Sequence, residues 1–229
     1  LNRFFSFHVI AVPLILIGLV AAHIVALHEV GSNNPDGVEI KKTKGADGHP
    51  LDGIPFHPYY TVKDIVGVVG FLIVFSIIVF FAPEGGGYFL EFNNFIPADP
   101  LKTPPHIAPV WYFTPFYSIL RAVTYPLFGI DAKFWGVVAM GAAVVIIAFL
   151  PWLDRSPVKS IRYKGGLFKI ILTVFIIAFF ILGYLGVLPP TPGRTLVSQI
   201  CSVIYFGFFL LMPVYSKMDK TKPVPERVT

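Results

Sequence analysis

The sequence predicts an all-α integral membrane protein with five transmembrane helices and an interfacial outer loop that carries short helices. Hydrophobic residues make up 55% of the 229 residues and charged residues only 14%, and the mean hydropathy is +0.72. Five apolar segments approach the length of about 20 residues that a helix needs to cross the bilayer core. A composition this apolar excludes a soluble globular fold.

The first predicted span, residues 1–30, is an apolar helix that carries histidines. Between residues 9 and 27 the only polar side chain is His23, and His8 lies 15 residues before it. An ionisable side chain in hydrocarbon is costly and usually functional. In a regular α-helix this spacing is about 22 Å along the axis and about 60° around it, so both imidazoles face one side. Two ligands at opposite membrane depths would suit two haems; the alternative is histidines hydrogen-bonded to neighbouring helices.

The remaining spans are predicted at residues 62–82, 132–150, 167–188 and 194–215. The connection at 31–61 is rich in Gly, Pro, Asn, Asp and Lys, which is typical of a loop outside the bilayer. Residues 83–130 are rich in proline at first and then show a short-helix pattern at 110–123. Cys201 is the one cysteine, which excludes an internal disulfide bond and a thiolate metal cluster.

The distribution of basic residues predicts the orientation of the spans. Thirteen of the 18 Lys and Arg residues lie at 29–63, at 151–169 or in the tail after residue 215. The other five lie in the alternate connections or at the opposite helix ends. Because cytoplasmic connections carry the excess of Lys and Arg, we expect a cytoplasmic C-terminus and an outer loop at 83–130. This placement indicates topology, and no nucleic-acid partner is expected.

Residues 1–30 resemble helix D of cytochrome b, the haem and quinone subunit of ubiquinol:cytochrome c oxidoreductase, in a proteobacterial-like form. The resemblance continues over the whole chain and matches helices D to H. It implies that residues 1–30 complete the haem-binding four-helix bundle, that 31–61 form a cytoplasmic loop, and that 62–229 form the C-terminal domain of helices E to H. We therefore expect this chain to be the C-terminal part of a longer protein.

The resemblance implies two haem b groups, each held by one histidine of helix D and one of helix B. His8 would ligate the low-potential haem near the outer face, and His23 the high-potential haem near the inner face. Respiratory relatives commonly space this pair by 14 residues. The spacing of 15 here, with Pro13 between, is similar to the split photosynthetic cytochrome and some proteobacterial forms. One extra residue turns one ring by about 100° unless the proline locally unwinds the helix.

Two motifs resemble the border of the quinone-reduction site. They are HEVGSNNP at residues 28–35 and FHPYYTVKD at 56–64. By position, they assign His28, Ser32, Lys63 and Asp64 to this site. Reduction of a quinone consumes two protons, which an imidazole and a nearby carboxylate can supply. Alternatively, His28 caps a helix end and the other two charges simply begin the next helix.

The segment TPPHIAPVWYFTPFYSILRAV at residues 103–123 resembles the quinol-oxidation motif. The family usually has Pro-Glu-Trp-Tyr, where this chain has Pro109, Val110, Trp111 and Tyr112. Tyr117 matches a family tyrosine that lines the site. A valine keeps the packing role of the motif but accepts no proton. The alternative for these aromatic residues is an interfacial belt.

Another acceptor must therefore serve the expected outer site. Ordered water past the two tyrosines is one route, and a carboxylate of Glu84 or Glu91 is the other.

The resemblance implies an electron-transfer subunit that oxidises ubiquinol outside and reduces ubiquinone inside with proton translocation, in a Q cycle. Its partners would be the Rieske iron–sulfur protein, a cytochrome c1-type subunit and the N-terminal half of cytochrome b, in a homodimeric complex of the bacterial inner membrane. The present chain alone is expected to be inactive. The alternative is a polytopic transporter or scaffold with histidines as a proton relay, but no clear repeat is present and Pro and Gly gather at the span ends.

Overall fold

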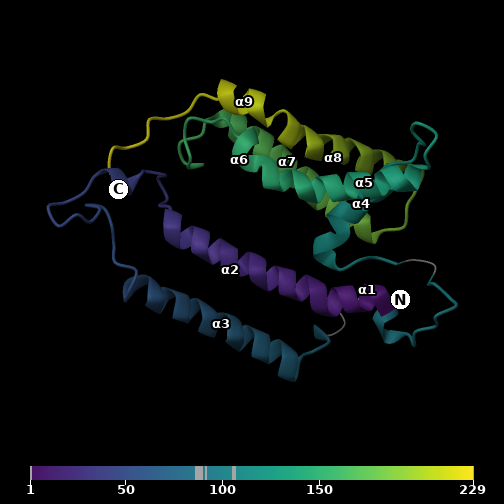
Figure 1. The fold of residues 1–229 in the computed structure, drawn as a ribbon. Helices are drawn as coiled ribbons and strands as arrows, with labels where there is room; N and C mark the ends of the chain where they lie inside the picture. The colour runs from purple at the N-terminus through teal and green to yellow at the C-terminus, as the bar shows by residue number, and fades with distance from the viewer. Residues whose placement is uncertain (1, 86–89, 91, 105–106, 229) are drawn as a thin grey trace. The chain divides into compact units, whose positions relative to one another are not determined.

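The computed structural model describes residues 2–85, 90, 92–104 and 107–228, and it divides into two compact units. One unit is Leu1–Asp52 with Pro223–Thr229, and the other is Gly53–Lys222. Among the described residues the secondary structure is helical, with only two isolated β-bridges (Figure 1). Within the described part of the chain, five helices are long and apolar enough to cross a membrane, which confirms the predicted all-α membrane fold.

The first unit begins with a single long helical segment, Asn2–Val30. It consists of α1 (Asn2–Ser6), a π-helical turn η1 (Phe7–Ala11) and α2 (Val12–Val30). The segment ends at Gly31, whose φ of 82° is readily available to a residue without a Cβ atom. Lys41 Nζ donates hydrogen bonds to the carbonyls of Glu29 and Val30, where a cation is favoured by the helix dipole.

The connection after α2 is held by side chains of its own. The Asn34 amide bonds the backbone of Asp36 and Val38, and η2 (Ile40–Lys42) follows. Arg227, near the end of the chain, donates to both carboxylate oxygens of Asp52 at 2.6–3.3 Å. This hydrogen-bonded guanidinium lowers the pKa of the Asp52 carboxyl below its usual value. The C-terminal residues therefore belong to the first unit.

The second unit contains one long isolated helix and a bundle. The helix is α3 (Tyr59–Phe81), which has no buried residue. The elements that follow in chain order are η4 (Phe92–Phe95), η5 (Trp111–Phe113), α4 (Thr114–Ala122), α5 (Ala132–Val145), η6 (Ile146–Phe149), α6 (Leu150–Leu153), α7 (Gly166–Val187), α8 (Pro192–Leu210) and α9 (Met212–Met218). Helices α5, η6 and α6 form one span, Ala132–Leu153.

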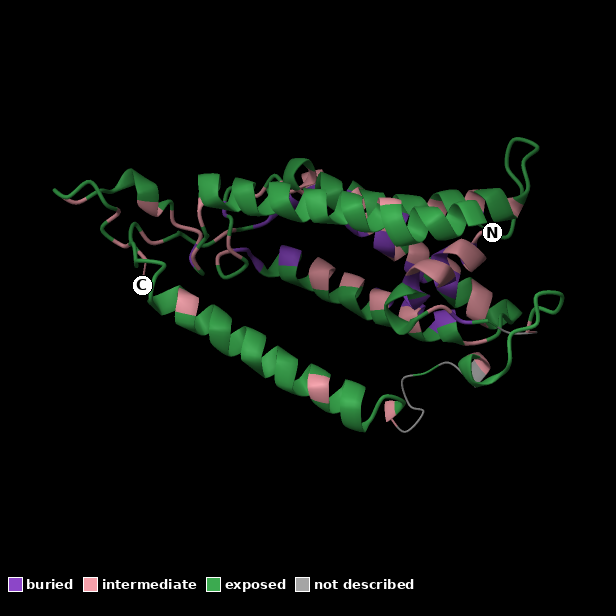
Figure 2. Ribbon diagram, turned by 60° about the horizontal axis from the view of Figure 1, so that its bottom comes forward, coloured by how far each residue is buried: buried purple, intermediate pink, exposed green. Residues whose placement is uncertain are grey.

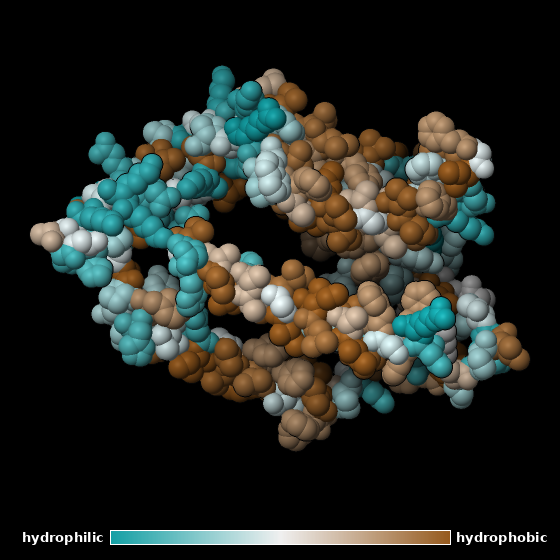
Figure 3. Space-filling view, viewed as in Figure 1, coloured by the Kyte–Doolittle hydropathy of each residue, from teal (hydrophilic) through white to brown (hydrophobic). Residues whose placement is uncertain are grey.

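The core of the bundle lies between α4, α5, α7 and α8, with α9 against one end. Its buried residues are Ile119, Ala143, Phe168, Ala178, Leu182, Cys201, Tyr205, Phe208, Phe209, Met212 and Tyr215. Phe175 stacks on Phe208 with ring centroids 4.2 Å apart, and the Tyr205 hydroxyl donates to the Ala143 carbonyl at 2.8 Å. Most buried residues of the bundle helices lie on their inner faces (Figure 2), and hydrophobic residues cover much of the visible helix surface (Figure 3). Lipid is the natural solvent for such outer faces.

The short helix α4 is fixed by two close backbone approaches. The Thr114 carbonyl lies where a Cβ atom at Gly186 of α7 would be, and the Leu120 carbonyl lies where one at Gly136 of α5 would be. Glycine therefore lets α7 and α5 touch opposite ends of α4 directly. The third predicted span, 132–150, therefore meets α4 directly at Gly136.

A polar clasp joins the connection 154–166 to the end of α9. The Asp219 carboxylate accepts from the backbone N–H groups of Gly165, at 2.6 Å, and Phe168, at 3.3 Å, and so caps α7. The Ser216 hydroxyl accepts from the N–H of Arg155 at 3.0 Å. Lys164 is buried and pairs with Asp154. This clasp closes one end of the bundle.

The predicted boundaries differ from the structure mainly in the last span. The sequence predicts a helix over 194–215, but α8 ends at Leu210 and α9 begins at Met212. Pro213, in the first turn of α9, has no N–H to continue the preceding hydrogen-bond ladder, which accounts for the break. The expected polar tail is correspondingly helical as far as Met218. The short helix predicted at 110–123 is present as η5 and α4.

The close approach at Gly186 predicts a large effect of a single methyl group. In the full-length protein, Gly186→Ala would push the Thr114 carbonyl away from α7 and lower the stability by about 1–3 kcal/mol. Gly207→Ala in α8 is the matched control, because a Cβ atom there meets open space. The control should be neutral or up to about 1 kcal/mol more stable. The measurement is the midpoint of thermal unfolding of each variant. Equal midpoints for Gly186→Ala and Gly207→Ala would contradict the close packing at Gly186.

Candidate functional site

His8 and His23 project from the same helical segment in the first unit, and both side chains are exposed. His8 lies inside the π-helical turn η1, and His23 lies in the regular part, α2. The N–H of Val12 bonds the carbonyl of Phe7, five residues earlier. A turn closed in this way holds one residue more than an α-helical turn. The 15-residue separation of His8 and His23 therefore rotates the chain about as much as 14 residues of a regular α-helix would. The angle between the two imidazoles around the helix axis changes from the expected value of about 60° to about 40° in the opposite sense.

The offset of about 60° predicted for a regular helix therefore does not hold for this segment. The sequence leaves open whether Pro13 unwinds the helix locally, and the structure has a π-helical turn shortly before the proline, at residues 7–11. Pro13 explains the position of the π-helical turn. The proline has no N–H to bond the Val9 carbonyl, and in a regular turn its ring would crowd that oxygen.

Each imidazole stands alone within the described part of the chain. Neither His8 nor His23 bonds another described residue, and no cluster of three or more His, Cys, Asp or Glu that could hold a metal ion is found there. The alternative of histidines bonded to neighbouring helices has no partner among the described residues. A neutral imidazole can occupy one axial position of a haem iron. The donor set therefore fits two haems that each take a second ligand from another segment.

The four residues expected at the inner site fall in different units. His28 lies in the last turn of α2 and Ser32 just beyond it, and both are exposed. Lys63 and Asp64 lie near the start of α3 and are exposed as well. Lys63 Nζ lies 5.2 Å from the centre of the Tyr60 ring. The structure thus describes two halves of this site separately.

The residues expected at the outer site form one continuous structure in the second unit. Pro109 is half-buried, and Val110 precedes η5 with its carbonyl accepting from the N–H of Phe113 at 2.8 Å. Trp111 and Tyr112 are 76% and 59% exposed, although their rings pack edge to face. Tyr117 is half-buried on α4. Two large aromatic side chains are thus presented outward from a rigid base, where a ligand or partner can contact them.

The base of this outer site is the beginning of α4. The Thr114 hydroxyl donates to the Trp111 carbonyl at 2.7 Å, which ties η5 to α4, and the Thr114 backbone rests on Gly186. In the buried interface with α8, the hydroxyls of Ser118 and Ser198 are hydrogen-bonded at 3.0 Å. The motif is therefore positioned by α7 and α8, which lie far from it in the sequence.

Arg121 joins the end of α4 to the end of α7. Its guanidinium donates to the carbonyls of Leu188 at 3.0 Å and Leu185 at 2.6 Å, and lies 4.7 Å from the centre of the Tyr117 ring. Burial lowers the pKa of Arg121, although the Tyr117 ring opposes this. Its buried Nε has no partner in the described structure. The positive charge therefore stabilises the C-terminal end of α7 and fixes the Tyr117 ring.

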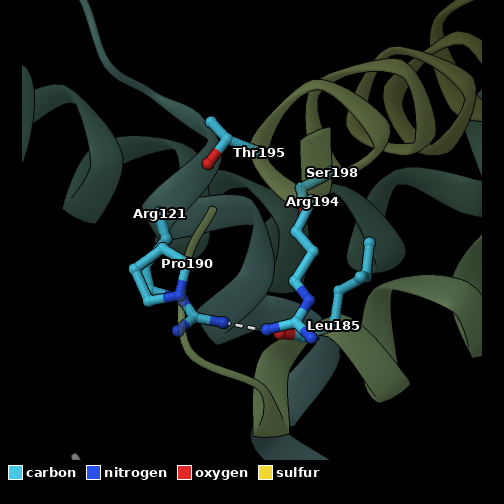
Figure 4. A pocket seen from close by; sticks show the side chains of 6 residues that line it. All are labelled: Arg121, Leu185, Pro190, Arg194, Thr195 and Ser198. Carbon is cyan, nitrogen blue, oxygen red and sulfur yellow. Dashed lines mark hydrogen bonds between the residues drawn. The ribbon is translucent and has the colours of Figure 1, made fainter. Parts of the chain in front are cut away.

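A small cavity lies beside this arginine. It is lined by Arg121, Leu185, Pro190, Arg194, Thr195 and Ser198 (Figure 4). Its free volume of about 10 Å³ is at the lower limit for one water molecule. This cavity is therefore too small for a quinone ring.

Comparison with known proteins agrees with these features. Residues 1–115 match the family described as cytochrome b(N-terminal)/b6/petB, and residues 97–206 match cytochrome b(C-terminal)/b6/petD. The chain belongs to the cytochrome b family. This confirms the resemblance seen in the sequence and decides against a transporter or scaffold.

Individual relatives show how much of a cytochrome b this chain represents. It is 60% identical to cytochrome b of Allochromatium vinosum over all of this chain and 55% of that protein. It is 44% identical to cytochrome b of Rhodospirillum rubrum over all of this chain and 52% of that protein. A chain of a hyperthermophilic respiratory complex III is similar with a TM-score of 0.77 and 39% identity, over 95% of this chain and 51% of that one. The chain thus spans about half the length of these cytochromes b.

Some residues that shape the expected outer site do not stand out in the sequence of this chain. Arg121 was counted only for topology, yet it caps α7 and contacts Tyr117. Ser118 was not considered, although Ser198, its partner, lies in a row of polar side chains at helical spacing on the last span. That row was the available signal. Glu91 and His106 lie outside the described residues, and Glu84 is exposed at the start of the loop.

The double hydrogen bond of Arg121 predicts that lysine cannot replace it. Arg121→Lys keeps the charge but loses the planar fork that reaches two carbonyls, and should cost about 1–3 kcal/mol. The matched control is Arg194→Lys, whose one observed hydrogen bond is exposed, and we expect a change within about 0.5 kcal/mol. Denaturant titration of the full-length protein in detergent measures both. A larger loss for Arg194→Lys would contradict this assignment.

Proposed function

We propose that this chain is the C-terminal part of the haem- and quinone-binding subunit of a quinol:cytochrome c oxidoreductase. The observation that carries the proposal is the pair of unpartnered imidazoles, His8 and His23, on one membrane-length helix. They would hold one axial position of each of two b haems. A bound haem b supplies a one-electron carrier. The second ligands would come from helix B, in the N-terminal half of the protein.

At the outer site, the proposed task is oxidation of quinol. The reaction releases two electrons and two protons; one electron would pass to a Rieske iron–sulfur protein and the other across the membrane. Tyr112 and Tyr117 can hydrogen-bond a quinol oxygen, and Trp111 offers a flat apolar surface. Val110 accepts no proton, so ordered water beside the tyrosines, or the carboxylate of Glu84 or Glu91, would carry protons outward.

At the inner site, the proposed task is reduction of quinone, which takes up protons from the cytoplasm. His28 and Asp64 are the groups that can transfer protons, and Ser32 and Lys63 can bind the quinone oxygens. All four side chains are accessible in their own unit, as the uptake of protons from water requires. Together the two sites would form a Q cycle with ubiquinone.

The proposed setting is a homodimeric complex in the bacterial inner membrane, with a cytoplasmic C-terminus. The partners would be the Rieske protein, a cytochrome c1-type subunit and the N-terminal half of cytochrome b. Lipid would cover the exposed apolar residues of α2 and α3 that no protein helix covers. The 229-residue chain alone would be inactive, because half of each haem site is supplied elsewhere.

Haem binding tests the proposal directly. The full-length protein in membranes should give the α-band of b-type haem in a dithionite-reduced minus oxidised spectrum. His8→Leu and His23→Leu should each remove one of the two haems. The isolated 229-residue chain should bind neither tightly, and adding helices A to C in trans should restore both. Stoichiometric bis-histidine haem in the isolated chain would contradict the proposed division of ligands.

The valine of the outer motif predicts a specific pattern of turnover. Because another group carries the protons, Val110→Glu should change quinol:cytochrome c turnover by less than about tenfold. Removal of the true proton acceptor should lower the turnover rate by a factor of about 10² to 10⁴, which is the usual contribution of a general base. Glu84→Gln, Glu91→Gln, Tyr112→Phe and Tyr117→Phe, assayed across pH, test which side chain is the acceptor. If none alters the rate or pH profile, these side chains are not acceptors.

A further inference from the structure

The π-helical turn η1 is an irregularity in an otherwise regular span. It occupies Phe7–Ala11 between two α-helical segments, and it contains His8. We propose that this turn is a one-residue register insertion that sets the direction of His8 relative to His23, so that ligation of the His8 haem depends on the turn as well as on the histidine. The inference rests on the proposed function and concerns how this chain presents its two ligands.

The geometry of helices sets the size of the effect. From Val12 to Val30 the helix is α-helical, so the position of His23 relative to Pro13 is that of a regular helix. One extra residue in a regular α-helix rotates everything before it by about 100°. The i→i+5 bond from Val12 to Phe7 takes up that residue within one turn. Without the turn, His8 would point about a quarter of a turn away from its present direction.

Pro13 fixes where the extra residue is taken up. A proline in the first turn of a helix is tolerated, but the regular turn before it would place the Val9 carbonyl against the ring. The widened turn lies immediately before the proline, on the side that carries His8. A change in this turn therefore moves His8 and leaves His23 in place. Such a change should therefore affect the haem bound by His8 and not the haem bound by His23.

Length variants in a Pro13→Ala background test this register. Alanine permits a regular helix, so deletion of Ile10 should give an unbroken α-helix with the histidines 14 residues apart and about the present alignment. Insertion of one alanine after Ile10 is the matched control, since it changes the length equally in the other direction. The two variants are made in the full-length protein and purified as the complete complex.

The readouts are the haem content per complex, the reduced minus oxidised spectrum and the EPR signals of the two ferric haems. We expect both haems after the deletion and loss of the His8 haem after the insertion. The His23 haem should remain in both variants, which reports folding independently of activity. Loss of the His8 haem after the deletion, or its retention after the insertion, would overturn the inference. A parent protein without haem would instead overturn the proposed function.

Discussion

The direct contact of α4 with two glycines is the constraint on which the bundle depends. The Thr114 and Leu120 carbonyls occupy the places of Cβ atoms at Gly186 and Gly136. Because α4 is only nine residues long, it has little stability of its own and takes its position from α7 and α5. The Trp111 carbonyl accepts a hydrogen bond from the Thr114 hydroxyl at the start of this helix, so the position of α4 also determines that of Trp111. A surface motif is thus located by the packing of membrane spans far away in the sequence.

The two long helices outside the bundle present the opposite situation. Neither α2 nor α3 has a buried residue, so their apolar side chains stay largely exposed in this chain. Burial of apolar surface in water stabilises a fold by about 25 cal/mol per Å², and within this chain α2 and α3 gain little of that free energy. Their stability must come from lipid and from other helices. This agrees with a chain that spans about half of its cytochrome b relatives.

The sequence predicted the features that depend on local pattern. Span number followed from hydropathy, and the short helix before residue 123 followed from its aromatic and proline spacing. His8 and His23 stood out because polar residues are rare in a span. The haem, quinone and sidedness assignments remain predictions.

Contacts between distant segments were not predictable in the same way. The roles of Arg121 and Asp219 depend on carbonyl and N–H groups that come close only in the folded bundle. The π-helical turn was not predicted, and unwinding at Pro13 was left open, because spacing alone does not say whether a helix bends or widens. Asn34 and Lys41 likewise acquire their roles only after the chain reverses direction beyond Gly31.

The clasp at Asp219 has a consequence for biosynthesis. The first turn of α7, at Gly165, receives its cap from a residue 54 positions later. While the ribosome still holds the few tens of residues that include Asp219, that cap is inside the exit tunnel and the start of α7 has free N–H groups. A helix that has already entered the membrane would therefore be completed only after Asp219 has emerged. Because Asp219 follows α8, closure of this end of the bundle would wait until α8 has been made.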